Sequence, residues 1–183
     1  MGVINMNVLI LDMDGTVRIK KGGVPGQLES GFISHPKDQE IIPGAVKAIE
    51  KYHQEGWIIV GASNQGGVAA GKKTLESCFK EQRYTIQLAP KIYRIYFCPD
   101  YEGKQLGIVA RSHSYLFEPK DNVYYKGLRS FRKPEPGMIQ YIQSEYERGK
   151  ILFVGDRPED EQAADKAGVD FQWASDWWIG DRK

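Results

Sequence analysis

Short apolar runs alternate along this chain with segments of helical periodicity, and this alternation restricts the fold more than any other feature of the sequence. A helix between two strands carries the chain back across a sheet, so the strands can pair in parallel. The pattern therefore predicts an α/β fold with one doubly wound parallel sheet, in a single domain over residues 1–183. Strands are expected at residues 8–11, 57–63, 91–99, 151–156 and 169–174, and helices at 43–56, 67–84, 134–149 and 158–168.

The composition narrows the class of protein. Hydrophobic residues make up 41% of the chain, and 25 Lys and Arg against 24 Asp and Glu leave a net charge of +1, which is no general signature of polyanion binding. No run of about 18 apolar residues predicts a membrane span, and the start of the chain is expected to be the first strand rather than a signal peptide. Cys78 and Cys98 are too few for a disulfide scaffold, so we expect two buried thiols and a cytoplasmic protein.

Polar residues gather where the predicted strands end. Parallel strands bring their carboxyl ends to one edge of a sheet, which is where such folds bind ligands. The residues expected at this edge are Asp12 and Asp14 after the first strand, Ser63, Asn64 and Gln65 after the second, Asp156 after the fourth, Asp160 one helical turn later, and Lys133 before the third helix.

These residue types suit phosphoryl transfer. Asp12, Asp14 and Asp156 could share Mg²⁺, which prefers oxygen ligands and would relieve the repulsion between neighbouring carboxylates. One carboxylate can act as a nucleophile that forms an aspartyl phosphate, and a second can act as general acid and base. Ser63 and Lys133 would hold phosphoryl oxygens and offset the charge that develops in transfer.

The stretches DMDGT, SNQ, RKPEPGM and GDRPEDEQAA resemble the four ordered motifs of the haloacid dehalogenase superfamily of phosphotransferases, and they extend over residues 8–168. The resemblance implies a phosphatase in which Asp12 is the nucleophile and Asp14 the general acid and base. It also implies that Ser63 and Lys133 bind phosphate and that Asp156 holds Mg²⁺.

SNQGG and RKPEPGM are similar to the small, nearly capless class of this superfamily, which includes heptose bisphosphate phosphatases, histidinol phosphatases and the 3′-phosphatase domain of polynucleotide kinases. This likeness implies that Asn64, Gln65 and Arg132 help to hold the substrate. Ser63 stands where this class most often has Thr. Heptose phosphatases carry a zinc loop with several Cys and one His, but this chain offers only Cys98 and His113 there, so no zinc is predicted.

Three functions remain open at this stage. We favour a phosphatase that acts on a small phosphorylated metabolite in an open site without a large cap domain. The alternative is a phosphatase of 3′-phosphorylated nucleic-acid ends, for which a set of basic residues would suit the backbone: Arg18, Lys20, Lys21, Lys72, Lys73, Arg129 and Arg132. A non-catalytic phospho-acceptor or binding domain is the third, although receiver domains place their acceptor Asp after the third strand.

Residues 18–43 and 99–132 interrupt the alternation and are expected to be loop excursions, the first with a short hairpin as an alternative. Without a cap domain, substrate specificity is expected from them, with these candidates: Gln27, Ser34, His35, Arg111, Ser112, Tyr124 and Tyr125.

Some single residues stay ambiguous. Asp160 is either a residue that orients Lys133 or a metal-bound water, or an ordinary residue of a helical turn. Arg157 either contacts substrate phosphate or pairs with nearby acids. Three Trp in the segment FQWASDWWIGDRK are expected to pack at the end of the sheet, with an aromatic binding platform as the alternative.

Overall fold

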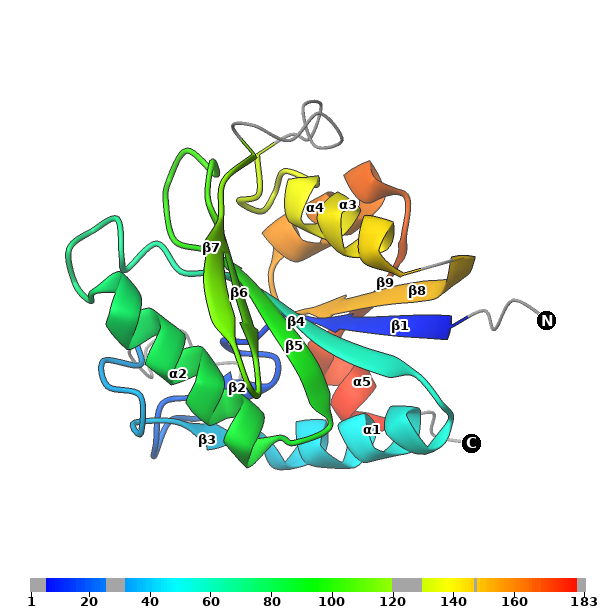
Figure 1. Ribbon diagram of the computed structural model, residues 1–183. Helices are drawn as coiled ribbons and strands as arrows, with labels where there is room; N and C mark the ends of the chain where they lie inside the picture. Colours follow the sequence, from blue (N-terminus) through cyan, green and yellow to red (C-terminus); the bar gives the residue numbers. More distant parts are fainter. Residues whose placement is uncertain (1–5, 26–31, 120–129, 147, 181–183) are drawn as a thin grey trace.

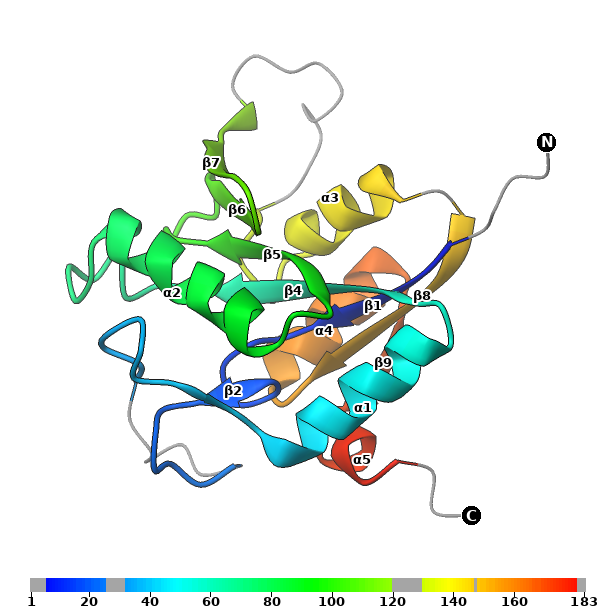
Figure 2. The same cartoon turned by 60° about the horizontal axis from the view of Figure 1, so that its bottom comes forward.

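A computed structural model describes residues 6–25, 32–119, 130–146 and 148–180 and shows a sheet of seven strands covered by helices on both faces (Figures 1 and 2). The strand order is β7-β6-β5-β4-β1-β8-β9. The strands are β1 (Met6–Leu11), β4 (Ile58–Asn64), β5 (Ile92–Cys98), β6 (Leu106–Ala110), β7 (Ser114–Phe117), β8 (Arg148–Gly155) and β9 (Asp170–Trp173). The helices are α1 (Pro43–Gln54), α2 (Leu75–Leu88), α3 (Gly137–Glu145), α4 (Pro158–Ala167) and α5 (Ala174–Ile179).

The central strand β1 is buried on both faces, between β4 and β8, and pairs in parallel with each. Successive side chains of a strand point to opposite faces. Leu9 and Leu11 therefore pack with α1, α2 and α5, whereas Val8 and Ile10 pack with α3 and α4. Because β1 is the middle one of the five parallel strands β5-β4-β1-β8-β9, the residues that follow it enter the middle of their carboxyl edge. The α/β fold expected from the sequence is confirmed.

The sheet is not wholly parallel, because β6 and β7 form an antiparallel hairpin beside β5. The prediction that residues 99–132 form only a loop excursion is therefore wrong for this part of the segment. The strand β6 reads LGIVA, and Gly107 conceals its strand character in the sequence. A Cβ atom on Gly107 would lie 2.2 Å from the ring of Phe97, so the glycine makes room for the aromatic side chain of β5. Residues 120–129, with Tyr124, Tyr125 and Arg129, lie outside the described residues.

The segment 18–43 contains the short hairpin that the sequence left open. β2 (Arg18–Ile19) pairs in antiparallel fashion with β3 (Glu40–Ile41), outside the main sheet. Gln27 lies outside the described part of this segment.

Helices α2 and α3 differ most from the predicted ranges. Helix α2 begins at Leu75 rather than at residue 67, because Thr74 caps it: the Thr74 side chain accepts a hydrogen bond from Ser77 N. Helix α3 ends at Glu145, and Gly149 belongs to β8 instead of ending the helix. A Cβ atom on Gly149 would lie 1.8 Å from the carbonyl oxygen of Met6, so this glycine permits close strand pairing.

The Trp-rich C-terminal segment packs as expected. Trp177 of α5 is buried in the same core cluster as α1, and Tyr52 of α1 lies 6.5 Å from it between ring centroids. None of the described helices combines the length and the apolar character that crossing a bilayer requires.

Candidate active site

Lys133 lies at the centre of the carboxyl edge, almost fully buried. Its Nζ atom donates to Asp12 Oδ1 at 2.6 Å and to the carbonyl oxygen of Ala62 at 2.9 Å, and it forms an ion pair with Asp160 Oδ1 at 2.6 Å. Asn64 holds the main chain of Lys133 in place. Its Oδ1 accepts from Lys133 N at 3.0 Å, and its Nδ2 donates to Lys133 O at 2.8 Å. Both ends of the Asn64 amide are thus engaged by Lys133, which indicates a positioning role.

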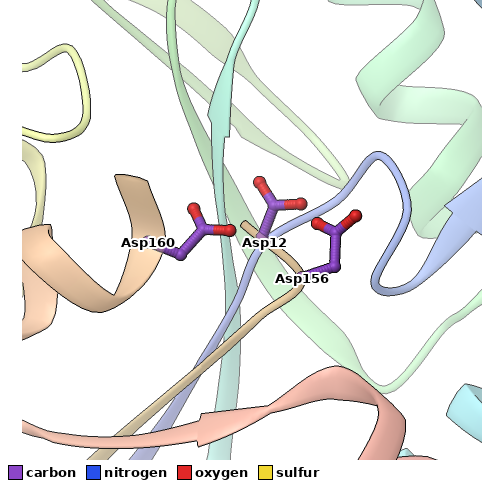
Figure 3. Close-up of side chains that lie close together, drawn as sticks. All are labelled: Asp12, Asp156 and Asp160. Atoms are coloured by element: carbon purple, nitrogen blue, oxygen red, sulfur yellow. The ribbon is translucent and has the colours of Figure 1, made fainter. Parts of the chain in front are cut away.

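Three carboxylates come together beside this lysine. Asp12 follows β1, Asp156 follows β8, and Asp160 lies in the first turn of α4, with ligand oxygens that all lie within 4.8 Å of one another (Figure 3). Thr16 Oγ1 donates to Asp156 Oδ1 at 3.3 Å. The second oxygen of Asp160 accepts from Arg157 N at 3.2 Å, so Asp160 both pairs with Lys133 and caps a helix. Asp160 therefore orients Lys133 and is also a residue of the helical turn, so its two interpretations are compatible.

The charges at this cluster do not balance. Burial raises the pKa of Asp12 and Asp156, and Asp160 raises both further, whereas Lys133 lowers them. Burial would lower the pKa of Lys133, but Asp12 and Asp160 outweigh it and raise that pKa, so the ammonium stays charged. One ammonium faces three carboxylates, and both oxygens of Asp160 already have partners. The remaining oxygens of Asp12 and Asp156 fit a hard divalent cation.

The carboxylate of Asp14 is not one of this group of three, and a share of Asp14 in the metal with Asp12 and Asp156 stays a prediction. Arg18 Nε donates to Asp14 Oδ1 at 2.9 Å, and Gln65 Nε2 donates to Asp14 Oδ2 at 2.7 Å. Ser63 Oγ is 3.4 Å from Asp14 Oδ2 and accepts from Gln65 Nε2 at 2.9 Å. Burial raises the pKa of Asp14, but the Arg18 guanidinium outweighs it and lowers that pKa. Asp14 is therefore oriented by its own partners, beside the Lys133 cluster.

The basic residues expected to face a phosphate backbone are partly unavailable. Arg18 is fully buried, and its guanidinium pairs with Asp14 and Glu81. Lys73 pairs with Glu81 at 2.6 Å. The predicted place on a nucleic-acid surface is therefore wrong for Arg18, and for Lys73 it stays a prediction.

Two arginines next to the motifs lie at the rim of the cluster. The Arg132 guanidinium lies 5.2 Å from the ring centroid of Tyr101, and its buried Nη1 atom has no hydrogen-bond partner among the described residues. Arg157 is the N-cap residue of α4, and its charge lowers the pKa of Asp156. Both interpretations of Arg157, contact with substrate phosphate and pairing with a nearby acid, stay open.

Two candidate specificity residues lie at the wrong edge. Ala110 pairs with Arg94, near the amino end of β5, and the turn that follows contains Arg111 and Ser112. Arg111 also donates to the carbonyl oxygen of Pro90. Because β6 runs antiparallel to β5, its turn lies at the end of the sheet opposite the cluster. These two residues cannot contact a substrate bound at Lys133.

The sequence reading missed Glu81 and the site contacts of Arg18, Thr16 and Lys73. One signal for Glu81 was available. Helix α2 buries Cys78, Glu81, Gln82 and Thr85, which are spaced as one helical face. A stripe of polar side chains at core spacing indicates buried partners, because buried polar groups are almost always paired.

Comparison with known proteins identifies the family. The family model described as "Polynucleotide kinase 3 phosphatase" matches residues 7–179, which is nearly the whole chain. The chain belongs to this phosphatase family. The D-glycero-beta-D-manno-heptose-1,7-bisphosphate 7-phosphatase of Bordetella bronchiseptica is 30% identical to it over 169 residues, which cover 89% of this chain and 77% of the relative. The enzyme of the same description from Pseudomonas putida is 28% identical over 170 residues, which cover 90% of this chain and 79% of that relative.

A solved structure shows the same relationship. The crystal structure of D,D-heptose 1,7-bisphosphate phosphatase from B. bronchiseptica, complexed with magnesium and phosphate, superposes on this phosphatase with a TM-score of 0.62 at 25% identity. The match covers 91% of this chain and 79% of the other. The resemblance to the small class of haloacid dehalogenase phosphatases is confirmed.

Proposed function

We propose that this phosphatase hydrolyses a monoester of a small phosphorylated metabolite, with Mg²⁺ as cofactor and Asp12 as nucleophile. The observation that carries the proposal is the position of Asp12. One of its oxygens is held by Lys133, and the carboxylate lies in a group of three acids that one lysine cannot balance. The relatives named as heptose bisphosphate 7-phosphatases support a sugar phosphate as the class of substrate.

Each residue has a chemical task in this proposal. One carboxylate oxygen of Asp12 attacks phosphorus, while the bond from phosphorus to the leaving oxygen breaks. Asp14, a carboxylate in the free enzyme, takes up a proton as the anionic substrate binds beside it and gives this proton to that oxygen, and the product alcohol departs. Asp14 then removes a proton from a water molecule, which attacks the aspartyl phosphate, releases inorganic phosphate and restores Asp12. Ser63 and Lys133 donate to phosphoryl oxygens.

Mg²⁺, when bound by Asp12 and Asp156, would offset the negative charge of the cluster and of the phosphoryl group. The same two acids with a full complement of waters would satisfy a hard cation, so the residues fit the ion.

Arg132 supports a substrate with a second anionic group. A guanidinium whose Nη1 has no hydrogen-bond partner within the described part of the chain favours a doubly charged ligand, because Arg binds phosphate with two parallel donors. This residue, Tyr101 and Gly66 form one rim: a Cβ on Gly66 would lie 3.1 Å from the Tyr101 ring and 3.2 Å from Arg132 Nη1. We infer that this rim receives the part of the substrate distant from the reacting phosphate.

The second candidate, a 3′-phosphorylated nucleic-acid end, is favoured by the description of the family model. Burial of Arg18 and the pairing of Lys73 weaken it, because fewer cations remain to follow a backbone. The two candidates differ in salt dependence. Each neutralised backbone phosphate releases counterions, so turnover of an oligonucleotide falls steeply with salt.

The test is a paired assay of heptose 1,7-bisphosphate and a 3′-phosphorylated oligonucleotide over a range of KCl concentrations, with the Asp12→Asn variant as control. We expect higher kcat/KM on the sugar, a shallow salt dependence and no turnover by the variant on either substrate. A far higher kcat/KM on the oligonucleotide, with a salt slope of several phosphate contacts, would establish the second candidate. Wild-type turnover by Asp12→Asn would remove the mechanism itself.

A further inference from the structure

A closed ring of hydrogen bonds and ion pairs holds the carboxylate of Asp14. Starting from Asp14, Arg18 donates to it and to Glu81 Oε1, the latter at 2.8 Å. Lys73 Nζ donates to Glu81 Oε2 at 2.6 Å and to Gln65 Oε1 at 3.2 Å. Gln65 Nε2 then donates to Asp14 Oδ2 at 2.7 Å and closes the ring.

The ring joins three parts of the chain that the sequence keeps far apart. Asp14 and Arg18 belong to the segment after β1, Gln65 and Lys73 to the segment after β4, and Glu81 to helix α2. Glu81 is the member that binds both cations, one with each carboxylate oxygen. It therefore fixes the distance between the two segments that enter the active site.

The ring is balanced in charge, and apart from Asp14, whose side chain is 40% exposed, it is almost closed to water. Two acids face two bases, Arg18 is fully buried, and the side chains of Glu81 and Lys73 are 1% and 12% exposed. A buried ion pair loses its compensation when one partner is removed, so the remaining charges must move or take up water. Loss of the Glu81 charge would free the guanidinium of Arg18 from its second anchor.

We propose that Glu81, with Arg18 and Lys73, positions Asp14 for proton transfer to the leaving group. The proposal rests on the proposed role of Asp14 as general acid and goes beyond it by assigning a task to α2. A proton donor must lie within hydrogen-bond reach of the leaving oxygen. The ring engages both Asp14 oxygens from fixed directions and leaves the carboxylate one orientation.

The leaving group separates positioning of Asp14 from general damage to the fold. p-Nitrophenolate leaves with little help from an acid, whereas an alkoxide needs its proton. Both p-nitrophenyl phosphate and an alkyl phosphate would be assayed as kcat/KM, which reports the step that expels the leaving group, for the wild type and for Glu81→Gln. General acid catalysis is worth about 100- to 10,000-fold, and partial misplacement is expected to remove about 10- to 100-fold on the alkyl phosphate.

The change on p-nitrophenyl phosphate is expected to be small by comparison. Glu76→Gln is the matched control, because Glu76 is an exposed acid of the same helix that pairs with Lys80, and it should leave both substrates unaffected. Equal losses on both substrates for Glu81→Gln would mean that Glu81 only supports the fold, and the proposal would be overturned.

Lys73→Met is a second variant for the case that Glu81→Gln does not fold, because Lys73 is more exposed than Glu81. It should show the same preference for the better leaving group. Asp14→Asn separates this proposal from the proposed function. A steep leaving-group dependence in Asp14→Asn with none in the ring variants refutes the positioning role alone. No such dependence in Asp14→Asn refutes the assignment of Asp14 as the acid.

Discussion

Lys133 Nζ lies 2.6 Å from Asp160 Oδ1, which joins the segment before α3 to the first turn of α4. The same atom lies 2.6 Å from Asp12 Oδ1. Asp160 thus gives Lys133 an anchor that is separate from the nucleophile. The two carboxylates and the carbonyl oxygen of Ala62 fix the position of the ammonium before a substrate arrives, which is the condition for electrostatic preorganisation.

Lys133→Met is expected to lower kcat by about 100- to 1,000-fold, the scale for removal of one preorganised donor. It should also destabilise the fold, because Asp12 and Asp160 would lose the ammonium between them. Turnover and thermal unfolding measure the two effects. Lys166→Met is the control: Lys166 pairs with Glu135 at the surface, where such pairs are worth at most about 1 kcal/mol. Wild-type turnover by Lys133→Met would exclude the role of Lys133.

Removal of Mg²⁺ is expected to abolish turnover and to lower the melting temperature. A ligand that binds only the folded state at about 100 times its Kd adds about 2.7 kcal/mol of stability. Asp156→Asn should lose most of the Mg²⁺-induced rise in melting temperature, whereas Asp165→Asn, an exposed acid of α4, should keep it. Full turnover in excess EDTA would contradict the metal requirement.

Local pattern was enough to predict the carboxyl edge but not the partners of Asp14. Apolar strands and the residues that follow them, such as Asp12 and Asp156, can be located from short stretches, because strand period and connection rules are local. Arg18 finds Glu81 across 63 positions of sequence, and a surface lysine or arginine and a buried one look alike in a pattern of charges. Partnership of this kind is decided by tertiary packing.

The hairpin β6–β7 was missed for a related reason. Its two strands continue the sheet at the edge, and the apolar run LGIVA is interrupted by a glycine that only the facing Phe97 explains. A glycine inside a strand usually weakens it, so the sequence favoured a loop.

Trp178→Phe is expected to weaken Mg²⁺ binding without changing kcat at saturating Mg²⁺. Trp178 Nε1 donates to the carbonyl oxygen of Thr16 at 2.8 Å, and the hydroxyl of Thr16 donates to Asp156. Loss of one such bond costs about 1 kcal/mol, which is about fivefold in the Mg²⁺ constant. Titration of activity with Mg²⁺ measures it, and Trp57→Phe, an indole that packs on Tyr52, is the control. An unchanged Mg²⁺ constant would show that α5 does not support the metal ligands.

The thiols give a prediction that depends on pH. Burial, and to a smaller extent the neighbouring acids Glu81 and Asp100, raise the pKa of Cys78 and of Cys98 to about 12. The thiolate is the reactive form, so native protein should resist alkylation by iodoacetamide at neutral pH. In the unfolded chain both thiols ionise near 9, so the unfolded state releases these protons first as pH rises. The free energy of unfolding should therefore fall from about pH 9 to about pH 12, and it should fall less over this range in Cys→Ala variants. Rapid alkylation of native protein at pH 7 would contradict the burial of the thiols.

The same burial leads to the expectation that the purified protein holds no stoichiometric zinc. Both oxygens of Asp100, beside Cys98, accept main-chain hydrogen bonds from Lys104 and Gln105, which commits this acid to its own turn. His113 lies in the turn after β6, at the opposite edge of the sheet, because Ala110 N donates to His113 O and Ala110 pairs with Arg94. Within the described ranges, one group of three acids, thiols or imidazoles could hold a metal, namely Asp12, Asp156 and Asp160. This group offers only oxygen ligands, which suit Mg²⁺, whereas zinc prefers nitrogen and sulfur ligands.

Elemental analysis after purification in a zinc-supplemented buffer and gel filtration measures the zinc content. About one zinc per chain, retained by Asp156→Asn and lost on Cys98→Ala, would place a zinc site in the segment after β5 and refute the prediction.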